Sequence, residues 1–416
     1  MTAAGTSVNG ARLWDSLMRM AQIGATSKGG CNRQALTDLD RAGRELFTGW
    51  CRELGCAIEV DALGNIFARR VGRDDAAPVV MTGSHLDTQP TGGRFDGVYG
   101  VLAGLEVFRT LEDKAIPTER PLELVVWTNE EGYRFDPAMM GSGVFAGVFP
   151  AEEILDKRDR DGLRLGDELA RIGYAGRRPA RPPGPIAAYL EAHIEQGPVL
   201  EQRGKTIGIV TGAQGIRAVE LSIRGQEAHA GPTPMEMRRD ALLPAARIAL
   251  EINRIARARP DGRGTLGELR VRPGSRNIVP GEAYLMIDLR HPDSDELEAM
   301  HQELRAYVEQ LAREAHPECA FEWLGTWLSP VVPFDPQVVA RVRQSAQRRG
   351  YACQDIVSGA GHDACYLARV APTAMIFVPC EGGISHNEAE SARPEDLEAG
   401  CNVLLDALLA SAGASD

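Results

Sequence analysis

The hydrophobic pattern of this 416-residue chain changes character twice, and this change constrains the fold more than any other feature. Residues 79–85 and 122–127 are short apolar runs typical of buried strands, and residues 98–111 between them carry apolar side chains at helical spacing. This rhythm predicts an α/β sheet with helices on its faces. Residues 157–185 are rich in Arg, Pro and Gly, and we expect them to form an exposed connection.

Near Thr211 apolar and polar residues begin to alternate, as they do in half-buried strands. A compact α+β domain is predicted here, with strands at 219–224, 283–290 and 319–327 and helices at 240–258 and 295–315. After Pro330 the α/β pattern returns, with a helix at 336–349, a strand at 374–378 and a helix at 394–409. We therefore expect an α/β fold in which a catalytic domain, residues 1–212 and 330–416, is interrupted by an inserted α+β domain, residues 213–329.

The charge balance argues against binding to nucleic acid or to acidic membranes. Lys and Arg number 46 and Asp and Glu number 58, so the formal net charge is −12, whereas such binders need a basic surface. No apolar run approaches the roughly 20 residues of a membrane-spanning helix. The first ten residues lack the features of a secretion signal, and the eight cysteines form no CxxC pair. A cytoplasmic protein with reduced thiols is expected.

Histidines and carboxylates follow several of the predicted strands. His85 and Asp87 lie on one side of a strand end, and Asp96 stands in a glycine-rich loop before the next helix. A carboxylate close to a metal-binding His can accept its other ring N–H, which is the role predicted for Asp87. Taken alone, His85 is equally consistent with a structural, hydrogen-bonded histidine. The glycine-rich loop alone could cradle a phosphate, but it lacks the spacing of the nucleotide-binding fingerprints.

Three further clusters add potential metal ligands: one contains Glu130 and Glu131, and the others contain His193 and His386. An isolated Glu-Glu pair is usually a solvated surface charge. On an extended segment, however, the two side chains point in opposite directions, so that one acid can bind a metal while the other faces a water. Imidazoles and carboxylates without thiolates suit Zn, Mn, Co or Ni. Three His and two acids are about right for two metals bridged by a carboxylate and a water.

These clusters resemble the motifs of the hydantoinase/carbamoylase amidases, a branch of the M20 metallopeptidase family. Five motifs carry the resemblance in order along nearly the whole chain: His85-Leu86-Asp87, Gly93-Arg94-Phe95-Asp96-Gly97, Asn129-Glu130-Glu131-Gly132, Glu191-Ala192-His193-Ile194-Glu195-Gln196-Gly197 and Ile384-Ser385-His386-Asn387. The branch includes N-carbamoyl-L-amino acid hydrolases, β-ureidopropionases and allantoate amidohydrolases. The resemblance implies a zinc-peptidase-like catalytic domain, an inserted dimerisation or lid domain, and a homodimer.

The resemblance also implies the metal ligands. Asp96 would bridge two divalent ions, one held in addition by His85 and His386 and the other by Glu131 and His193. A histidine at 193, and a glycine rather than an acid after Asp96, favour the carbamoylases over the peptidase relatives.

Further roles follow from the same resemblance. Glu130 would be the general base, His229 would stabilise the oxyanion, and Arg290 would hold the substrate carboxylate with two parallel hydrogen bonds. The remaining substrate-binding residues would be Gln196, Asn277, Gly361 and His362. In contrast, His291, His301 and His316 lack acidic neighbours in a motif, and we expect them at the surface.

The leading hypothesis is therefore a metal-dependent amidohydrolase acting on N-carbamoyl-L-amino acids or N-carbamoyl-β-alanine, with no nucleic-acid or membrane partner. Allantoate amidohydrolase is the nearest alternative, because it would use the same centre on a longer ureido substrate. A non-catalytic protein that binds ureido compounds is the alternative from another class. It is disfavoured because every predicted ligand and Glu130 are present.

Overall fold

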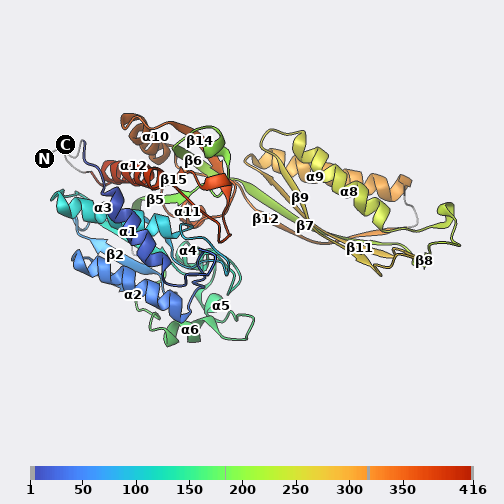
Figure 1. Ribbon diagram of the computed structural model, residues 1–416, viewed down its shortest axis with the longest axis horizontal. Helices are drawn as coiled ribbons and strands as arrows, with labels where there is room; N and C mark the ends of the chain where they lie inside the picture. The colour runs from blue at the N-terminus through green and yellow to red at the C-terminus, as the bar shows by residue number, and fades with distance from the viewer. Residues whose placement is uncertain (1–4, 183, 316–318, 414–416) are drawn as a thin grey trace. The chain divides into compact units, whose positions relative to one another are not determined.

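The computed structural model describes residues 5–182, 184–315 and 319–413, except for the side chains of residues 314 and 315. The chain forms two compact units (Figure 1). The first comprises Met1–Gly212 and Pro333–Asp416, and the second comprises Ala213–Val332. The outer unit is α/β and the inserted unit is α+β, as the change in hydrophobic pattern predicts.

The first unit is built on a nine-stranded sheet of the described residues. Its strand order is β1-β2-β4-β3-β5-β15-β6-β13, with β14 paired to β6. The strands are β1 (Ala57–Val60), β2 (Ile66–Arg70), β3 (Val79–His85), β4 (Leu122–Trp127), β5 (Ile186–Ile194), β6 (Ile207–Ala213), β13 (Val332–Pro333), β14 (Cys353–Ser358) and β15 (Thr373–Val378). The four central strands β4, β3, β5 and β15 run parallel to one another. Their residues are almost all buried, because helices cover both faces of such a sheet.

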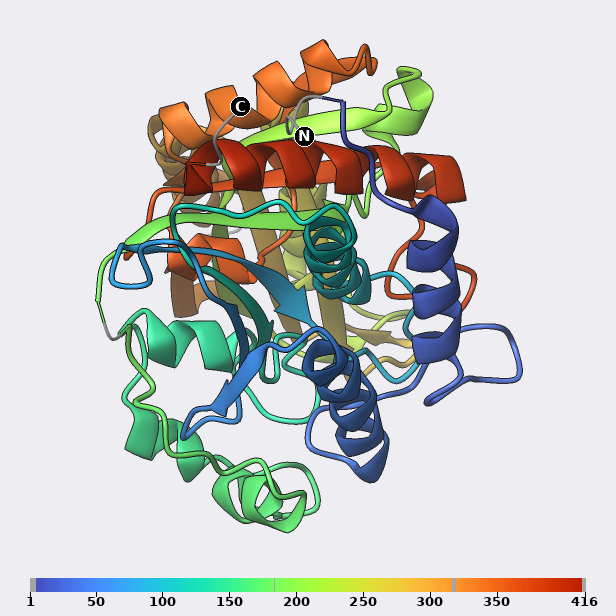
Figure 2. The ribbon, with the colours of Figure 1, turned by 90° about the vertical axis from the view of Figure 1, so that its left-hand side faces the viewer.

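Helices pack on both faces of this sheet. On one face lie α3, α10 and α12, and on the other lie α4 and α11; Figure 2 shows α12, in red, beside the sheet. Trp127 lies on the second face, where its indole packs against Phe145 of α4. The same indole donates a hydrogen bond to the Tyr189 hydroxyl at 3.1 Å. The helices of this unit are α1 (Gly10–Ala21), α2 (Asp38–Glu53), α3 (Val98–Asp113), α4 (Met140–Phe145), α5 (Ala151–Leu155), α6 (Leu165–Arg171), α7 (Val199–Gln202), α10 (Pro336–Arg348), α11 (Asp363–Leu367) and α12 (Pro394–Ala412).

The inserted unit is an antiparallel sheet with two helices on one face. The sheet has the order β12-β7-β11-β9, and a separate two-stranded pair joins β8 to β10. Leu221, Leu285 and Ile287 project from the sheet into a core completed by Ile248 and Met300 of the two helices. The elements are β7 (Gly215–Arg224), β8 (Ala228–His229), β9 (Arg263–Arg272), β10 (Ile278–Val279), β11 (Glu282–His291), β12 (Ala320–Ser329), α8 (Leu242–Arg257) and α9 (Ser294–Gln310).

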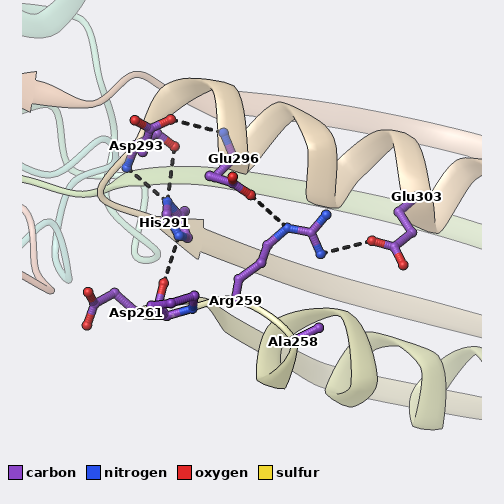
Figure 3. A pocket seen from close by; sticks show the side chains of 8 residues that line it. Ala258, Arg259, Asp261, His291, Asp293, Glu296 and Glu303 are labelled. Atoms are coloured by element: carbon purple, nitrogen blue, oxygen red, sulfur yellow. Dashed lines mark hydrogen bonds and ion pairs between the residues drawn. The ribbon is translucent and has the colours of Figure 1, made fainter.

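Three expectations about exposed parts of the chain are wrong. The stretch 157–185 contains α6, whose Leu165 and Leu169 join a buried apolar cluster, so it is not simply an exposed connection. His291 is buried as well. Its Nε2 donates to the carbonyl of Pro260 at 2.9 Å, and its Nδ1 accepts the backbone N–H of Asp293 at 3.0 Å (Figure 3).

His301 on α9 is buried too, contrary to expectation, because α9 turns this face toward the core of the inserted unit. His316 lies outside the described residues. All eight cysteines are free thiols. No helix in the described part of the chain is both long and apolar enough to cross a membrane.

Candidate metal centre and active site

The candidate site lies at the carboxyl edge of the parallel strands. His85 is the last residue of β3, and His193 is the next to last residue of β5. Glu131 follows the end of β4 by four residues, and His386 comes from the loop after β15. The fifth side chain, Asp96, stands just before α3. Parallel strands end at one sheet edge, so motifs more than a hundred residues apart in sequence meet there.

The Asp96 carboxylate is the centre of this arrangement. Its Oδ1 lies 3.1 Å from Nε2 of His193 and 3.7 Å from Nε2 of His85. Its Oδ2 lies 3.2 Å from Nε2 of His386, which is itself 3.3 Å from Oε2 of Glu131. The structure thus brings all five predicted ligands together.

The grouping of these ligands differs from the expected pairing. His85 and His193 share one side of Asp96, and Glu131 and His386 share the other. The physical reason is the strand order. Because β3 and β5 are neighbours, their terminal histidines emerge side by side, with ring centroids 6.1 Å apart.

The role expected for Asp87 is also different. The Nδ1 of His85 lies 2.9 Å from the backbone carbonyl of Asp87, whereas the Asp87 carboxylate is 3.9 Å away. That carboxylate instead accepts the backbone N–H groups of Glu130 at 3.3 Å and of Glu131 at 3.2 Å. Asp87 therefore fixes the segment that carries both glutamates, while its backbone orients the histidine.

The donor set fits a divalent metal. The Nδ1 atoms of His85 and His193 each face a backbone carbonyl at 2.9 Å, which turns their Nε2 atoms toward Asp96. The donors are imidazole nitrogens and carboxylate oxygens without a thiolate, a set that suits Zn, Mn, Co or Ni.

Burial and neighbouring groups shift the pKa values of the carboxyl groups at the site. Burial acts to raise the pKa of Asp96, but hydrogen bonds from His193, His386 and His85 hold that pKa well below its usual range. Burial, with the nearby Asp96 charge, raises the pKa of Glu131 to about 7. Burial also raises the pKa of Glu130 well above its usual range. A cation among these carboxyls would lower the two raised pKa values by its charge.

Gln196 and His386 both have a left-handed backbone, with φ of 57° and 53°. In this conformation the Gln196 Nε2 donates to Asp96 Oδ2 at 2.8 Å and to the Ser385 hydroxyl at 3.2 Å. Such strain in non-glycine residues is typical of functional sites. Gln196 therefore lies at the centre, and its contact with substrate stays a prediction.

His362 lies behind the predicted ligands. It is 2% exposed, packs edge-on against His193 with ring centroids 4.5 Å apart, and bonds through Nε2 to the Ser358 hydroxyl at 3.0 Å. Burial and the neighbouring His193 lower its pKa well below the usual value, so the ring is neutral. The adjoining Gly361 is exposed. Substrate binding stays a prediction for both residues.

The other predicted substrate residues belong to the inserted unit. His229 is exposed on β8 and pairs with Ile278 of β10, and the carbonyl of Asn277 accepts the backbone N–H of Ala230 at 2.8 Å. His229 and Asn277 therefore lie close together. Arg290 is the next to last residue of β11, and its guanidinium pairs with the Asp288 carboxylate at 2.7 Å.

One buried acid at the site is not singled out by the sequence. Glu390 is 1% exposed and accepts the backbone N–H of Asp96 at 3.2 Å. It follows His386 by four residues in a loop that also contains Glu388. No periodicity separates these two glutamates in the sequence, so only the fold distinguishes them.

The chain is similar to known proteins in sequence and in fold. Residues 81–410 match the Peptidase family M20/M25/M40. The chain is 48% identical to an N-carbamoyl-L-amino-acid amidohydrolase of Rhizobium meliloti, over 99% of each chain. It is 34% identical to an allantoate amidohydrolase of Bacillus subtilis, over 95% of this chain and 96% of the relative. A solved amidase of the hydantoinase/carbamoylase family from Burkholderia multivorans has a TM-score of 0.94 and 56% identity over 98% of each chain.

Gly97 lies close to the imidazole of His85, and a substitution can test this contact. Gly97 has a φ of +66°, and a Cβ on it would lie 2.2 Å from Nε2 of His85. Gly97→Ala should therefore displace the imidazole and weaken binding of a divalent metal by at least about tenfold, measured by competition with a chelator.

Gly55→Ala is the matched control, because Gly55 has a φ of +70° and open space where the Cβ would go. It also places an alanine at a positive φ, and it should leave metal affinity unchanged. Equal affinities for the two variants would contradict the placement of His85.

Proposed function

Because this chain belongs to the peptidase family M20/M25/M40, we propose that it is a metal-dependent amidohydrolase that cleaves the carbamoyl C–N bond of N-carbamoyl-L-amino acids or N-carbamoyl-β-alanine. One water is consumed, and the products are the amino acid, ammonia and carbon dioxide. The observation that carries the proposal is the buried Glu130 carboxyl, 3.5 Å from a histidine of the candidate metal centre.

The proposed cofactor is a pair of divalent ions, drawn from Zn, Mn, Co or Ni. His85 and His193 would hold one ion, Glu131 and His386 would hold the other, and Asp96 would bridge them. When bound, such a pair lowers the pKa of a water and polarises a carbonyl oxygen.

The protein would supply proton transfer and positioning. Glu130 is 8% exposed, and its backbone is fixed through its N–H to Asp87, so that its carboxyl is held in place. In the proposed reaction it takes a proton from the attacking water and passes it to the leaving nitrogen. His229 would donate a hydrogen bond to the developing oxyanion, and Arg290 would hold the substrate carboxylate. Gln196, Asn277, Gly361 and His362 would complete the substrate contacts.

The proposed base can be tested by a substitution that keeps its shape. Glu130→Gln removes the proton acceptor, so kcat should fall by roughly 10²–10⁴-fold while the affinity for divalent metal stays nearly constant. Glu195→Gln is the control, because Glu195 is also 8% exposed but accepts backbone N–H groups of Val199 and Leu200 at the start of α7. Near-normal turnover by Glu130→Gln would refute the assignment of the base.

The geometry of the inserted unit supports a homodimer with shared sites. His229 and Asn277 lie at the β8–β10 pair, beyond the end of β7 (Figure 1). Strand β11 begins at Glu282, three residues after β10 ends at Val279. Arg290 lies eight residues further along β11, or roughly 27 Å at the rise of a strand. The carboxylate and carbamoyl carbon of the substrate are only on the order of 5 Å apart. Arg290 and His229 of one chain therefore cannot hold the same substrate molecule, whereas residues from two copies can.

Mixing two inactive variants tests this sharing. In a heterodimer of His229→Ala and Glu130→Gln chains, one site receives intact Glu130 from its own chain and intact His229 from the other. After subunit exchange, turnover should recover to about a quarter of the wild-type value, since half of the dimers are mixed and each has one complete site.

A mixture of Glu130→Gln with Asp96→Asn provides the control. Glu130 and Asp96 both belong to the candidate metal centre of their own chain. Each site of a heterodimer therefore keeps one of the two changes, and no recovery is expected. If the His229→Ala mixture also stays inactive while subunits exchange, His229 does not act across the dimer.

The substrate itself is the remaining choice, since the relative from Bacillus subtilis is named an allantoate amidohydrolase. The metal-loaded protein should be assayed in parallel with N-carbamoyl-L-amino acids, N-carbamoyl-β-alanine and allantoate. We expect the highest kcat/KM with an N-carbamoyl amino acid. A preference for allantoate would favour the alternative, and binding without turnover would favour a ureido-binding protein.

A further inference from the structure

We propose that Glu390 is a positioning residue for the metal centre: its buried carboxylate ties the loop that carries Asp96 to the segment that carries His386. The proposal rests on the proposed metal site but not on the proposed reaction. Nothing in the resemblance to known amidases assigns Glu390 a role. Its hydrogen bonds, its burial and the glycine that faces it support this role.

The first contact is with the Asp96 loop. Oε1 of Glu390 accepts two consecutive backbone N–H groups, from Phe95 at 2.9 Å and from Asp96 at 3.2 Å. Hydrogen bonds from N–H groups to a carboxylate are roughly twice as strong as those between neutral groups. One oxygen therefore fixes the peptide units from which the Asp96 side chain extends.

The second contact is with the segment before His386. Oε2 of Glu390 lies 3.0 Å from the Ser385 hydroxyl, which also lies 3.2 Å from Oδ2 of Asp96. Gln196 donates to the same hydroxyl and to the same Asp96 oxygen. Glu390 thus joins the two segments that supply Asp96 and its neighbour His386, although 290 residues separate those ligands in sequence.

The surroundings of Glu390 are shaped to receive it. The side chain is 1% exposed. A Cβ built on Gly93 would lie 2.0 Å from Cδ and from Oε1 of Glu390, and its three nearest atoms would all belong to this carboxyl. Gly93 therefore leaves the space that the Glu390 carboxylate fills, three residues before Asp96.

The role of Glu390 matters most for His386, because His386 is the most exposed of the five predicted ligands. Its side chain is 52% exposed, it belongs to a loop, and its backbone has a φ of 53°. His85 and His193, in contrast, are buried at the ends of strands. We expect loss of Glu390 to affect the Glu131–His386 side of the centre more than the His85–His193 side.

The test uses the full-length protein, stripped of metal and titrated with cobalt(II) chloride, with affinity measured by chelator competition and ligand geometry by visible absorption. Glu390→Ala should weaken binding of the more weakly held ion by about 10–100-fold and change the absorption spectrum. Glu390→Gln keeps an acceptor for the two N–H groups and should restore most of the affinity. Glu388→Ala, two residues away, should bind like the wild type.

A double substitution separates positioning from general destabilisation. Gly93→Ala should also weaken cobalt binding, because its Cβ would displace the Glu390 carboxyl. In the Glu390→Ala background the same change should add little, since the two act through one contact. Circular dichroism of the metal-free proteins checks folding; if Glu390→Ala does not fold, the comparison of Glu390→Gln with Gly93→Ala decides.

Several outcomes would overturn the proposal. These are wild-type affinity and spectrum in Glu390→Ala, equal loss in Glu390→Gln and Glu390→Ala, or effects of Gly93→Ala and Glu390→Ala that simply add. If Glu390→Ala does not fold, tight binding by Gly93→Ala would overturn it. No substrate enters this experiment. A wild-type protein that binds cobalt but hydrolyses no ureido compound would refute the proposed function and leave the role of Glu390 intact.

Discussion

The whole site depends on how one buried carboxylate is held. Asp96 faces the Nε2 atoms of three imidazoles, and hydrogen bonds from those rings keep it charged although burial acts in the opposite direction. Each of the two strand-end histidines, His85 and His193, is in turn oriented by a backbone carbonyl. Main-chain groups at the end of β5 and just beyond the end of β3 therefore orient these two rings.

The two units contribute different groups to the proposed chemistry: one carries the candidate metal ligands, and the other carries predicted substrate-binding residues. Strand ends and the start of a helix supply His85, His193 and Asp96, whereas Glu131 and His386 come from the loops after β4 and β15. The inserted unit supplies two polar groups: His229 at the β8–β10 pair and Arg290 near the end of β11. The proposed function assigns these two groups of one chain to different sites, so the proposed enzyme would need a second copy of itself.

The sequence predicts the fold and the identity of the clustered residues well. Strands β3 and β4 have the predicted bounds, because short, mostly apolar runs mark where a buried strand begins and ends. The grouping of ligands around Asp96 could not be predicted, because it follows from the spatial order of β4, β3, β5 and β15. Local pattern also fails for His291, which is buried by a turn that follows α8. The roles assigned to individual site residues stay predictions.

The strand order has a consequence for how the protein is made. Strand β15 lies between β5 and β6 in the sheet, yet it is synthesised more than 150 residues after them. A gap in the middle of the sheet therefore persists until the ribosome has passed residue 378. The inserted unit is continuous in sequence and has its own core, so it is free to fold while the surrounding sheet is still open. During biosynthesis the inner unit would thus precede the outer one, and the strand leading to His386 would close the sheet last.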